Sequence, residues 1–267
     1  MHFIKNGHYY KILHGGKYYR LINPRRLFLF TIIPSPADAT VTLTATGYTQ
    51  VGNTISVPAG TQVSWSVSKS GIPTQTGTET ITEPKTIYVT IGYPRGTVLF
   101  ESSTPGTYNI NVLYPCTVHV DVVGGGGGGW TYGGSFGYTS CSGGGSGAYV
   151  HGTLNINAGV YSIVVGSGGN GSTSGPNASN GGQSSCFGQA ANGGEGGKNT
   201  GGGSGGGYSI NVSTLTGVNG NGGGTAYSKN PSTSGGASKY GGYGAGGGAN
   251  KSTAYKGGNG YVKIYVE

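Results

Sequence analysis

Apolar and polar residues alternate through the stretch from Phe28 to Ile91. Short segments place an apolar side chain at every second position, and turn residues such as Gly52-Asn53 and Pro58-Ala59-Gly60 separate them. The segments are Val41/Leu43, Ile55/Val57, Val63/Trp65/Val67 and Ile87/Val89/Ile91. A period of two is typical of a β-strand with one buried face. The pattern therefore predicts a small all-β sandwich over residues 27–92.

The first apolar segment, Leu27 to Ile33, also imitates a secretory signal peptide. Arg25-Arg26 precede it and Ala37-Asp38-Ala39 follows it, as in a cleavage site. Because the apolar part is short and bounded by proline, we favour a buried β-strand that opens the sandwich. No segment approaches the roughly 18 apolar residues of a membrane span.

Alternation returns in Thr117 to Val123 and stops at six consecutive glycines, Gly124 to Gly129. Glycine then dominates the rest of a chain that holds 60 glycines in 267 residues, which raises the question of collagen. The strict Gly-X-Y period and the proline of collagen are absent, so a triple helix is excluded. A flexible linker and a set of packed polyglycine II helices remain.

Strand-like segments interrupt the glycine and favour the packed alternative. Gly147 to Gly166 resembles two strands joined at Asn157-Ala158-Gly159, and Ser209 to Thr214 and Gly260 to Glu267 also alternate. A flexible linker has no need of strands, so we expect a β-frame that carries glycine helices able to bond side by side. The expected helices include Gly143–Gly145, Gly193–Gly197, Gly201–Gly207, Gly222–Gly224, Gly246–Gly248 and Gly257–Gly260.

The order of these motifs resembles a known family. From Gly96–Glu101 and Pro105–Tyr108 through Val118–Gly129 to the closing Gly260–Tyr265, residues from about 94 to 267 are similar to the glycine-rich domain of bacteriophage tail-fibre and adhesin proteins. A related module occurs in some animal receptor kinases. The resemblance implies a β-sandwich frame with bundled polyglycine II helices and variable tip loops for host recognition. Residues 28–92 resemble, less specifically, the PEGA-type β-modules of surface proteins.

Positive charge is concentrated at the N-terminus. Of a formal net charge of +8, six positive charges lie within the first 26 residues, where no acidic residue occurs. The near-repeat of Gly7–Leu13 and Gly16–Ile22 predicts a β-meander, with turns at Asn6-Gly7 and His14-Gly15-Gly16, that is marginal on its own. We therefore predict an anchor to other virion proteins through Lys11, Lys17, Tyr19, Arg20, Arg25 and Arg26. A solvated basic face that protects strand edges and, more weakly, nucleic-acid binding are the alternatives.

The inventory of reactive residues argues against catalysis. A glycosidase needs two placed carboxylates, and only Glu79 and Glu83 among the seven acidic residues are close in sequence. Cys116 and His119 point to opposite faces of an extended strand, so they cannot chelate one metal ion. Whether Cys141 and Cys186 pair is left open. We expect no catalytic, cofactor-binding or metal-binding residue.

The segments between glycine runs are rich in Tyr, Ser, Gly and Asn, the composition of antibody binding loops. The candidate receptor contacts are Trp130, Tyr132, Tyr138, Tyr227, Tyr240, Tyr243 and Tyr255. Trp130 and Phe136 have an alternative role, which is to cover a glycine bundle that has no apolar side chains of its own.

We therefore expect an all-β virion protein with an anchor (1–26), a β-sandwich spacer (27–92) and a glycine-rich domain (93–267). Its partners would be other virion proteins and a host-surface glycan or outer protein, without nucleic acid or membrane. A homo-oligomer is expected, with a trimer among the options. The alternatives are a virion decoration or head-fibre protein without a receptor role, a secreted bacterial adhesin and, ranked last, a polysaccharide depolymerase.

Overall fold

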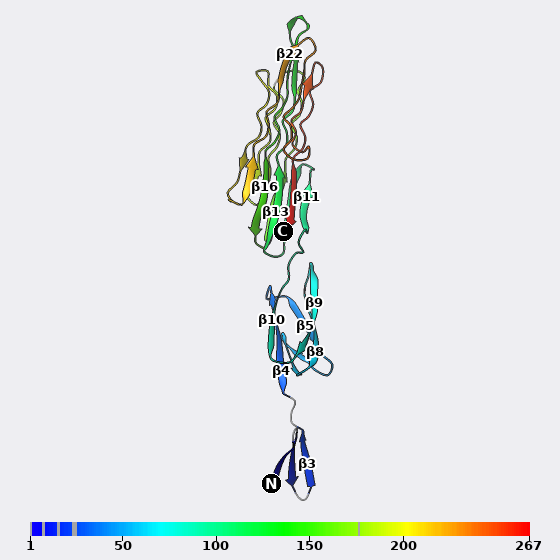
Figure 1. The fold of residues 1–267 in the computed structure, drawn as a ribbon. Helices are drawn as coiled ribbons and strands as arrows, with labels where there is room; N and C mark the ends of the chain where they lie inside the picture. The colour runs from blue at the N-terminus through cyan, green and yellow to red at the C-terminus, as the bar shows by residue number, and fades with distance from the viewer. Residues whose placement is uncertain (1, 7–8, 15–16, 23–25, 176) are drawn as a thin grey trace. The chain divides into compact units, whose positions relative to one another are not determined.

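The computed structural model describes residues 2–6, 9–14, 17–22, 26–175 and 177–267 (Figure 1). Contacts divide the chain into two compact units, residues 1–92 and 93–267. Apart from one short 3-10 turn, Ser135–Gly137, the regular elements of the described residues are β-strands. No helix in these ranges is long and apolar enough to cross a membrane. The predicted all-β fold with sandwich modules is confirmed.

The first unit begins with an antiparallel meander of β1 (His2–Asn6), β2 (Tyr9–His14) and β3 (Lys17–Ile22). The predicted turns between these strands fall partly outside the described residues. A sheet of β10 (Lys85–Thr90), β4 (Leu27–Ser35), β7 (Thr54–Pro58) and β6 (Gln50–Val51) follows, with a second sheet of β5 (Thr40–Thr44), β8 (Thr61–Lys69) and β9 (Ile72–Ile81). Phe30 and Ile32 are fully buried, which confirms that the apolar segment forms the strand that opens this module.

The second unit is built on two five-stranded sheets, which we call the frame. One contains β11 (Val98–Ser102), β25 (Tyr261–Val266), β13 (Cys116–Val123), β16 (Tyr149–Ile156) and β21 (Leu215–Val218). The other contains β12 (Gly106–Val112), β17 (Gly159–Val165), β18 (Ser184–Cys186), β19 (Gln189–Ala191) and β20 (Tyr208–Ser209). The inward residues of both sheets, among them Val120, Ile163 and Ile264, form one apolar core.

The two predicted strands within Gly147 to Gly166 are confirmed as β16 and β17, which lie in different sheets of the frame, and the predicted closing strand is confirmed as β25. The predicted strand Ser209 to Thr214 is wrong. Residues 210–214 connect β20 to β21, which begins only at Leu215. Ile210 and Val212 nevertheless pack against the core, so their alternation reports side-chain burial without backbone pairing.

Beyond the frame lie the glycine runs, a name we use for the following segments: residues 124–129, 143–147, 166–171, 178–182, 192–197, 202–207, 220–224, 234–237, 244–248 and 255–258. The amides of Gly124 to Gly129 donate in order to the carbonyls of Ala148, Gly182, Gly258, Gly145, Ser179 and Tyr255, at 2.8 to 3.0 Å. Amides three residues apart therefore bond to the same neighbouring run. The direction of hydrogen bonding repeats every three residues, and these three neighbours run antiparallel to the first run.

A second set of neighbours surrounds the same run. A Cβ added to each residue from Gly124 to Gly129 would lie 1.9 to 2.2 Å from a backbone oxygen, in order that of Asn192, Ser167, Ala245, Glu195, Asn170 and Gly248. This order again repeats every three residues, and these neighbours run parallel to the first run. No side chain fits at such distances, so glycine is required here. Contacts of this kind belong to a packed structure and not to a flexible linker.

Candidate functional site

The end of the glycine runs that lies away from the frame carries small sheets of its own, which we call the tip (Figure 1). β14 (Trp130–Gly133), β15 (Thr139–Ser142) and β22 (Thr225–Ser228) form an antiparallel sheet, and β23 (Ser232–Thr233) pairs with β24 (Ala249–Asn250). β14 directly continues the run that leaves β13. The tip is therefore connected to the frame through the packed glycine runs.

Aromatic side chains are exposed across the tip. Tyr132, Tyr138, Tyr227 and Tyr255 all have large accessible fractions, led by Tyr227 at 66%. The rings of Tyr138 and Tyr227 stack with centroids 5.4 Å apart and planes at 25°. The Nζ atom of Lys229 lies 5.9 Å from the centre of the Tyr138 ring, within the range of a cation–π contact. Four of the seven predicted contact residues are thus gathered and exposed at the tip.

Phe136 is the most exposed large apolar residue of the tip, with 95% of its surface accessible. Its φ of 61° lies in the left-handed region, which is uncommon for a bulky residue and costs about 1–2 kcal/mol. Burial of its own ring does not offset this cost. The expectation that Phe136 covers the glycine runs is therefore wrong, and an aromatic ring stands free at the turn between β14 and β15.

Trp130 has the opposite environment, with only 1% of its surface exposed. Its ring stacks on Tyr132, with centroids 6.0 Å apart, and its Nε1 atom donates to the carbonyl of Gly175 at 3.4 Å. Trp130 thus has almost no surface to offer a partner. Its position at the end of the first run fits the covering role predicted as its alternative.

A groove of about 310 Å³ lies beside Tyr227, between β15, β22 and the turn at residues 199–201. Hydroxyl and amide side chains line it, among them Ser140, Asn199, Thr200 and Thr225. No charged side chain contributes to this lining. The tip therefore combines exposed rings with a concave polar surface.

A known protein family matches the part of the chain that forms the frame, the packed runs and the tip. The family described as "Glycine-rich domain" matches residues 102–266. The chain belongs to this family. A comparison with curated proteins finds no match.

Two predicted contact residues of the glycine-rich domain lie far from its tip. Tyr243 stacks on Tyr261, at the start of β25, with centroids 4.3 Å apart and planes at 10°. Tyr240 lies 5.6 Å from Tyr261 and 5.0 Å from Tyr149, again between ring centroids. The structure thus places Tyr240 and Tyr243 against the frame and does not bring them together with the tip residues.

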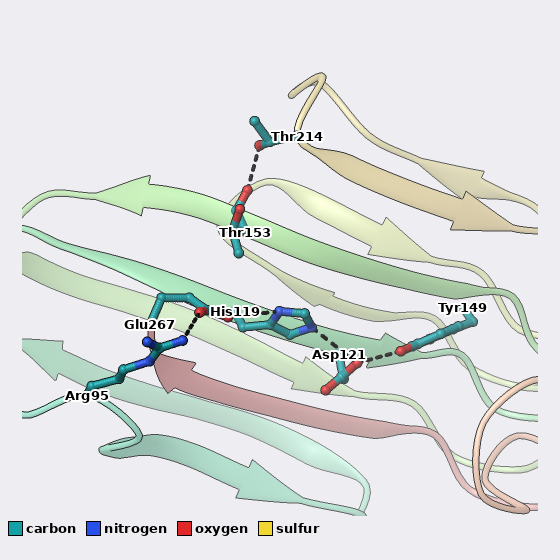
Figure 2. A network of polar contacts seen from close by, with 7 residues as sticks. All are labelled: Arg95, His119, Asp121, Tyr149, Thr153, Thr214 and Glu267. Atoms are coloured by element: carbon teal, nitrogen blue, oxygen red, sulfur yellow. Dashed lines mark hydrogen bonds and ion pairs between the residues drawn. The ribbon is translucent and has the colours of Figure 1, made fainter.

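The same face of the frame carries a polar network that the sequence analysis missed (Figure 2). His119 lies between two carboxylates, with Nδ1 3.3 Å from Glu267 Oε1 and Nε2 3.8 Å from Asp121 Oδ1. Arg95 reaches the other oxygen of Glu267 at 3.7 Å, and the Tyr149 hydroxyl donates to Asp121 at 2.5 Å. Burial, followed by this hydrogen bond, raises the pKa of Tyr149 well above its usual range. His119 and Asp121 are two residues apart in β13, as are Tyr265 and Glu267 at the end of the chain. This spacing places each pair on one face of the sheet, and it was the signal in the sequence for the network.

This network connects β13, β16 and the residue that follows β25. Within the described residues no group of three His, Cys, Asp or Glu side chains is arranged to hold a metal ion. Cys116 packs against the core while His119 lies on the outer face, as the strand geometry predicts. Glu79, the first residue of the only close carboxylate pair, is bonded to Lys85 at 2.6 Å.

The cysteines of the glycine-rich domain are free thiols. Cys141 lies in β15 at the tip, whereas Cys186 lies in β18 within the core of the frame, so the two do not face each other. Burial raises the pKa of Cys186 to about 12 and also raises the pKa of Cys116.

The predicted anchor residues belong to the first unit. Lys11 of β2 is the register partner of Arg20 in β3, and Lys17 and Tyr19 pair with His14 and Ile12. Arg25 lies outside the described residues. Arg26 is exposed, with its Cζ atom 5.3 Å from the centre of the Phe28 ring.

Proposed function

We propose that this protein is a structural protein of a bacteriophage particle that attaches to the host cell surface through the tip of its glycine-rich domain. The observation that carries the proposal is the tip itself, where Phe136 is held in a strained turn at 95% exposure beside the stacked Tyr138 and Tyr227. Strain in a bulky exposed residue is usually retained for function. Such rings supply contact area at a low entropic cost when they bind a partner.

The glycine runs are, we further propose, packed polyglycine II helices. Three residues per turn is the period of that helix, which has no internal hydrogen bonds. The three-residue repeat of both the hydrogen bonds and the close approaches around residues 124–129 supports this assignment. A run bonded on all sides resists bending, so the tip would be presented on a stiff support.

Mounting variable loops on a stiff scaffold is a common way to build a recognition surface. The groove beside Tyr227 supplies hydroxyl and amide groups, and the tyrosines supply flat apolar surface. This combination suits a host-surface glycan or the loops of an outer protein. Tyr240 and Tyr243 are left out of the proposed contact surface because they pack against the frame.

The basic meander would attach the protein to the particle, which is its proposed location. Lys11 and Arg20 occupy paired positions of this meander. The six positive charges of the first 26 residues, with no acidic residue among them, suit an acidic surface on another virion protein. A homo-oligomer, a decoration role without receptor binding and a secreted adhesin remain distinct outcomes to be tested.

Electron microscopy of the intact particle with an antibody against residues 130–138 tests the location. Label on the distal ends of tail fibres or on the tail tip supports the proposal. Label on the head, or no label on any particle, contradicts attachment through this tip. A competition assay complements the imaging, because the purified full chain should block adsorption of the particle that carries it.

A further inference from the structure

A pocket of about 530 Å³ opens in the frame, at the ends of β16 and β18 that lie away from the glycine runs. Its walls come from the β16–β17 connection between the two sheets, the β18–β19 hairpin and the connection after β20. Six of its lining residues matter here: Asn155, Asn157, Tyr161, Phe187, Gln189 and Asn211. The volume lies within the range of about 300–1,000 Å³ that is usual for small-molecule sites.

Phe187 occupies an unusual backbone position on the wall of this pocket. Cys186 pairs with Gln189, so Phe187 and Gly188 form a two-residue turn with φ values of 49° and 76°. Such a turn needs positive φ at both positions and normally takes Asn or Asp first. A phenylalanine there is unfavourable, yet Phe136-Gly137 at the tip repeats the same pair, with φ values of 61° and 77°. These two are the positive-φ residues other than glycine among the described residues.

The strained position holds the ring of Phe187 edge-on to Tyr161. Their centroids are 4.9 Å apart and their planes lie at 75°. Part of the Phe187 side chain packs against the core, and the remainder lines the pocket. The turn therefore presents an aromatic surface to whatever enters.

Carboxamides supply the polar part of the wall. Gln189 is buried, and hydrogen bonds to its neighbours fix its side chain. Its Nε2 atom donates to the carbonyl of Phe187 at 3.1 Å and to Asn211 Oδ1. Its Oε1 atom accepts from the backbone N–H of Asn211 at 2.9 Å. Asn155 Oδ1 accepts from the Thr117 hydroxyl at 2.6 Å, on the face of β13 and β16 that is opposite to the core. No side chain that is charged at neutral pH contributes to the lining.

We infer that this pocket binds a neutral carbohydrate. The carboxamide of Asn157, which is exposed in this lining, offers both a donor and an acceptor, as do the neighbouring hydroxyls of a sugar ring. The aromatic surface suits the apolar C–H face of the same ring. A charged ligand would lose its hydration without finding an opposite charge. The site lies at the other end of the domain from the tip, so this inference is independent of the proposed attachment function.

Saturation-transfer NMR on the full chain tests the inference. The probes are the methyl glycosides of glucose, galactose and N-acetylglucosamine, with galacturonic acid and N-acetylneuraminic acid as anionic controls. We expect transfer to at least one neutral glycoside and transfer at least tenfold weaker to both acids. Phe187→Asn should lower the transfer at least tenfold without lowering Tm, because asparagine is favoured in this turn.

Two further variants keep the test decisive. Phe136→Asn makes the same change in the other Phe-Gly pair with positive φ, which lies in a longer loop at the tip, and should leave sugar binding intact, whatever it does to attachment. Asn157→Ala, at an exposed position, should weaken binding several-fold even if Phe187→Asn folds poorly. Absence of transfer to every neutral glycoside overturns the inference. Sugar binding by Phe187→Asn at the wild-type level also overturns it. If Phe187→Asn has a lower Tm than the wild type, unchanged sugar binding by Asn157→Ala overturns it instead.

Discussion

A Cβ atom added to Gly203 would lie 2.0 Å from the backbone oxygen of Glu195. Real Cβ atoms do not approach an oxygen this closely, so two runs would have to separate. We expect Gly203→Ala and Gly205→Ala to lower the stability of the glycine-rich domain by more than about 1 kcal/mol each. Thermal or urea unfolding of the purified chain measures the effect.

Gly201→Ala is the matched control for this prediction. Its added Cβ would have no atom within 4 Å, and no positive φ is needed there. We expect its stability to stay within about 0.5 kcal/mol of the wild type. If all three variants melt alike, the packing of the runs does not stabilise the domain.

Host binding should depend on the tip and be unevenly distributed over it. Among Phe136→Ala, Tyr227→Ala and Tyr255→Ala, we expect one or two to lower affinity by more than about 2 kcal/mol and the rest to change little. Exchange of residues 227–233 and 250–254, which leaves the glycine runs intact, for unrelated polar loops should abolish or redirect attachment. Adsorption to the host, with Tm as the folding check, measures both effects.

Tyr88→Ala is the control, since Tyr88 lies on β10 of the first unit and is 77% exposed. This variant should bind the host as the wild type does. Unchanged adsorption after exchange of both tip loops would leave the glycine-rich domain as a structural spike.

Removal of residues 1–26 should leave both downstream modules folded, because each has its own strands and core. We expect an unchanged Tm and loss of incorporation into the particle. Assembly of the shortened chain together with the remaining virion proteins measures the effect. Normal incorporation would show that the anchor lies elsewhere.

Stability should fall at alkaline pH because of Tyr149 and Tyr261. Burial, then hydrogen bonds to Asp121 and Glu101, raises the pKa of both phenols above the usual value of about 10. A phenol with a higher pKa in the folded state contributes stability that is complete below the unfolded pKa and is lost as the pH rises above it. We expect Tm to drop between about pH 10 and pH 12.

Circular dichroism melts across this range measure the drop. The double variant Tyr149→Phe/Tyr261→Phe should show a flatter dependence on pH, whereas Tyr132→Phe at the exposed tip should retain the wild-type slope. Equal slopes for all three proteins would exclude these two phenols as the cause.

The three cysteines should titrate as three thiols in denaturant without a reductant. Cys141 and Cys186 lie at opposite ends of the glycine-rich domain, which prevents an intramolecular disulfide in the folded chain. Ellman's reagent measures the number. A result of one thiol would contradict the three free cysteines described here.

The strands of the frame could be predicted from the sequence because burial of one face places an apolar residue at every second position. Val118, Val120 and Val122 are all fully buried, and the strand they belong to was predicted directly. The same logic failed at Ile210 and Val212, because apolar residues can pack on a core without a neighbouring strand. Burial is visible in a sequence, but a hydrogen-bonding partner is not.

The location of the tyrosines was harder to predict. Successive runs alternate in direction between frame and tip, so the end at which a loop lies depends on counting every run before it. Residues 166–171, 178–182 and 234–237 contain no three consecutive glycines and were not expected among the runs. With them missing from the count, Tyr240 and Tyr243 were grouped with the tip residues although they stack at the frame.

The repeat of three residues also restricts how the length of this protein can change. In the polyproline II geometry proposed for the runs, each residue advances about 3.1 Å. Three residues added to every run would keep each amide opposite its present partner and carry the tip about 9 Å further out. One or two added residues would turn every amide toward the wrong neighbour. The reach of such a protein would therefore evolve in discrete steps, while single insertions would accumulate only in the loops at either end.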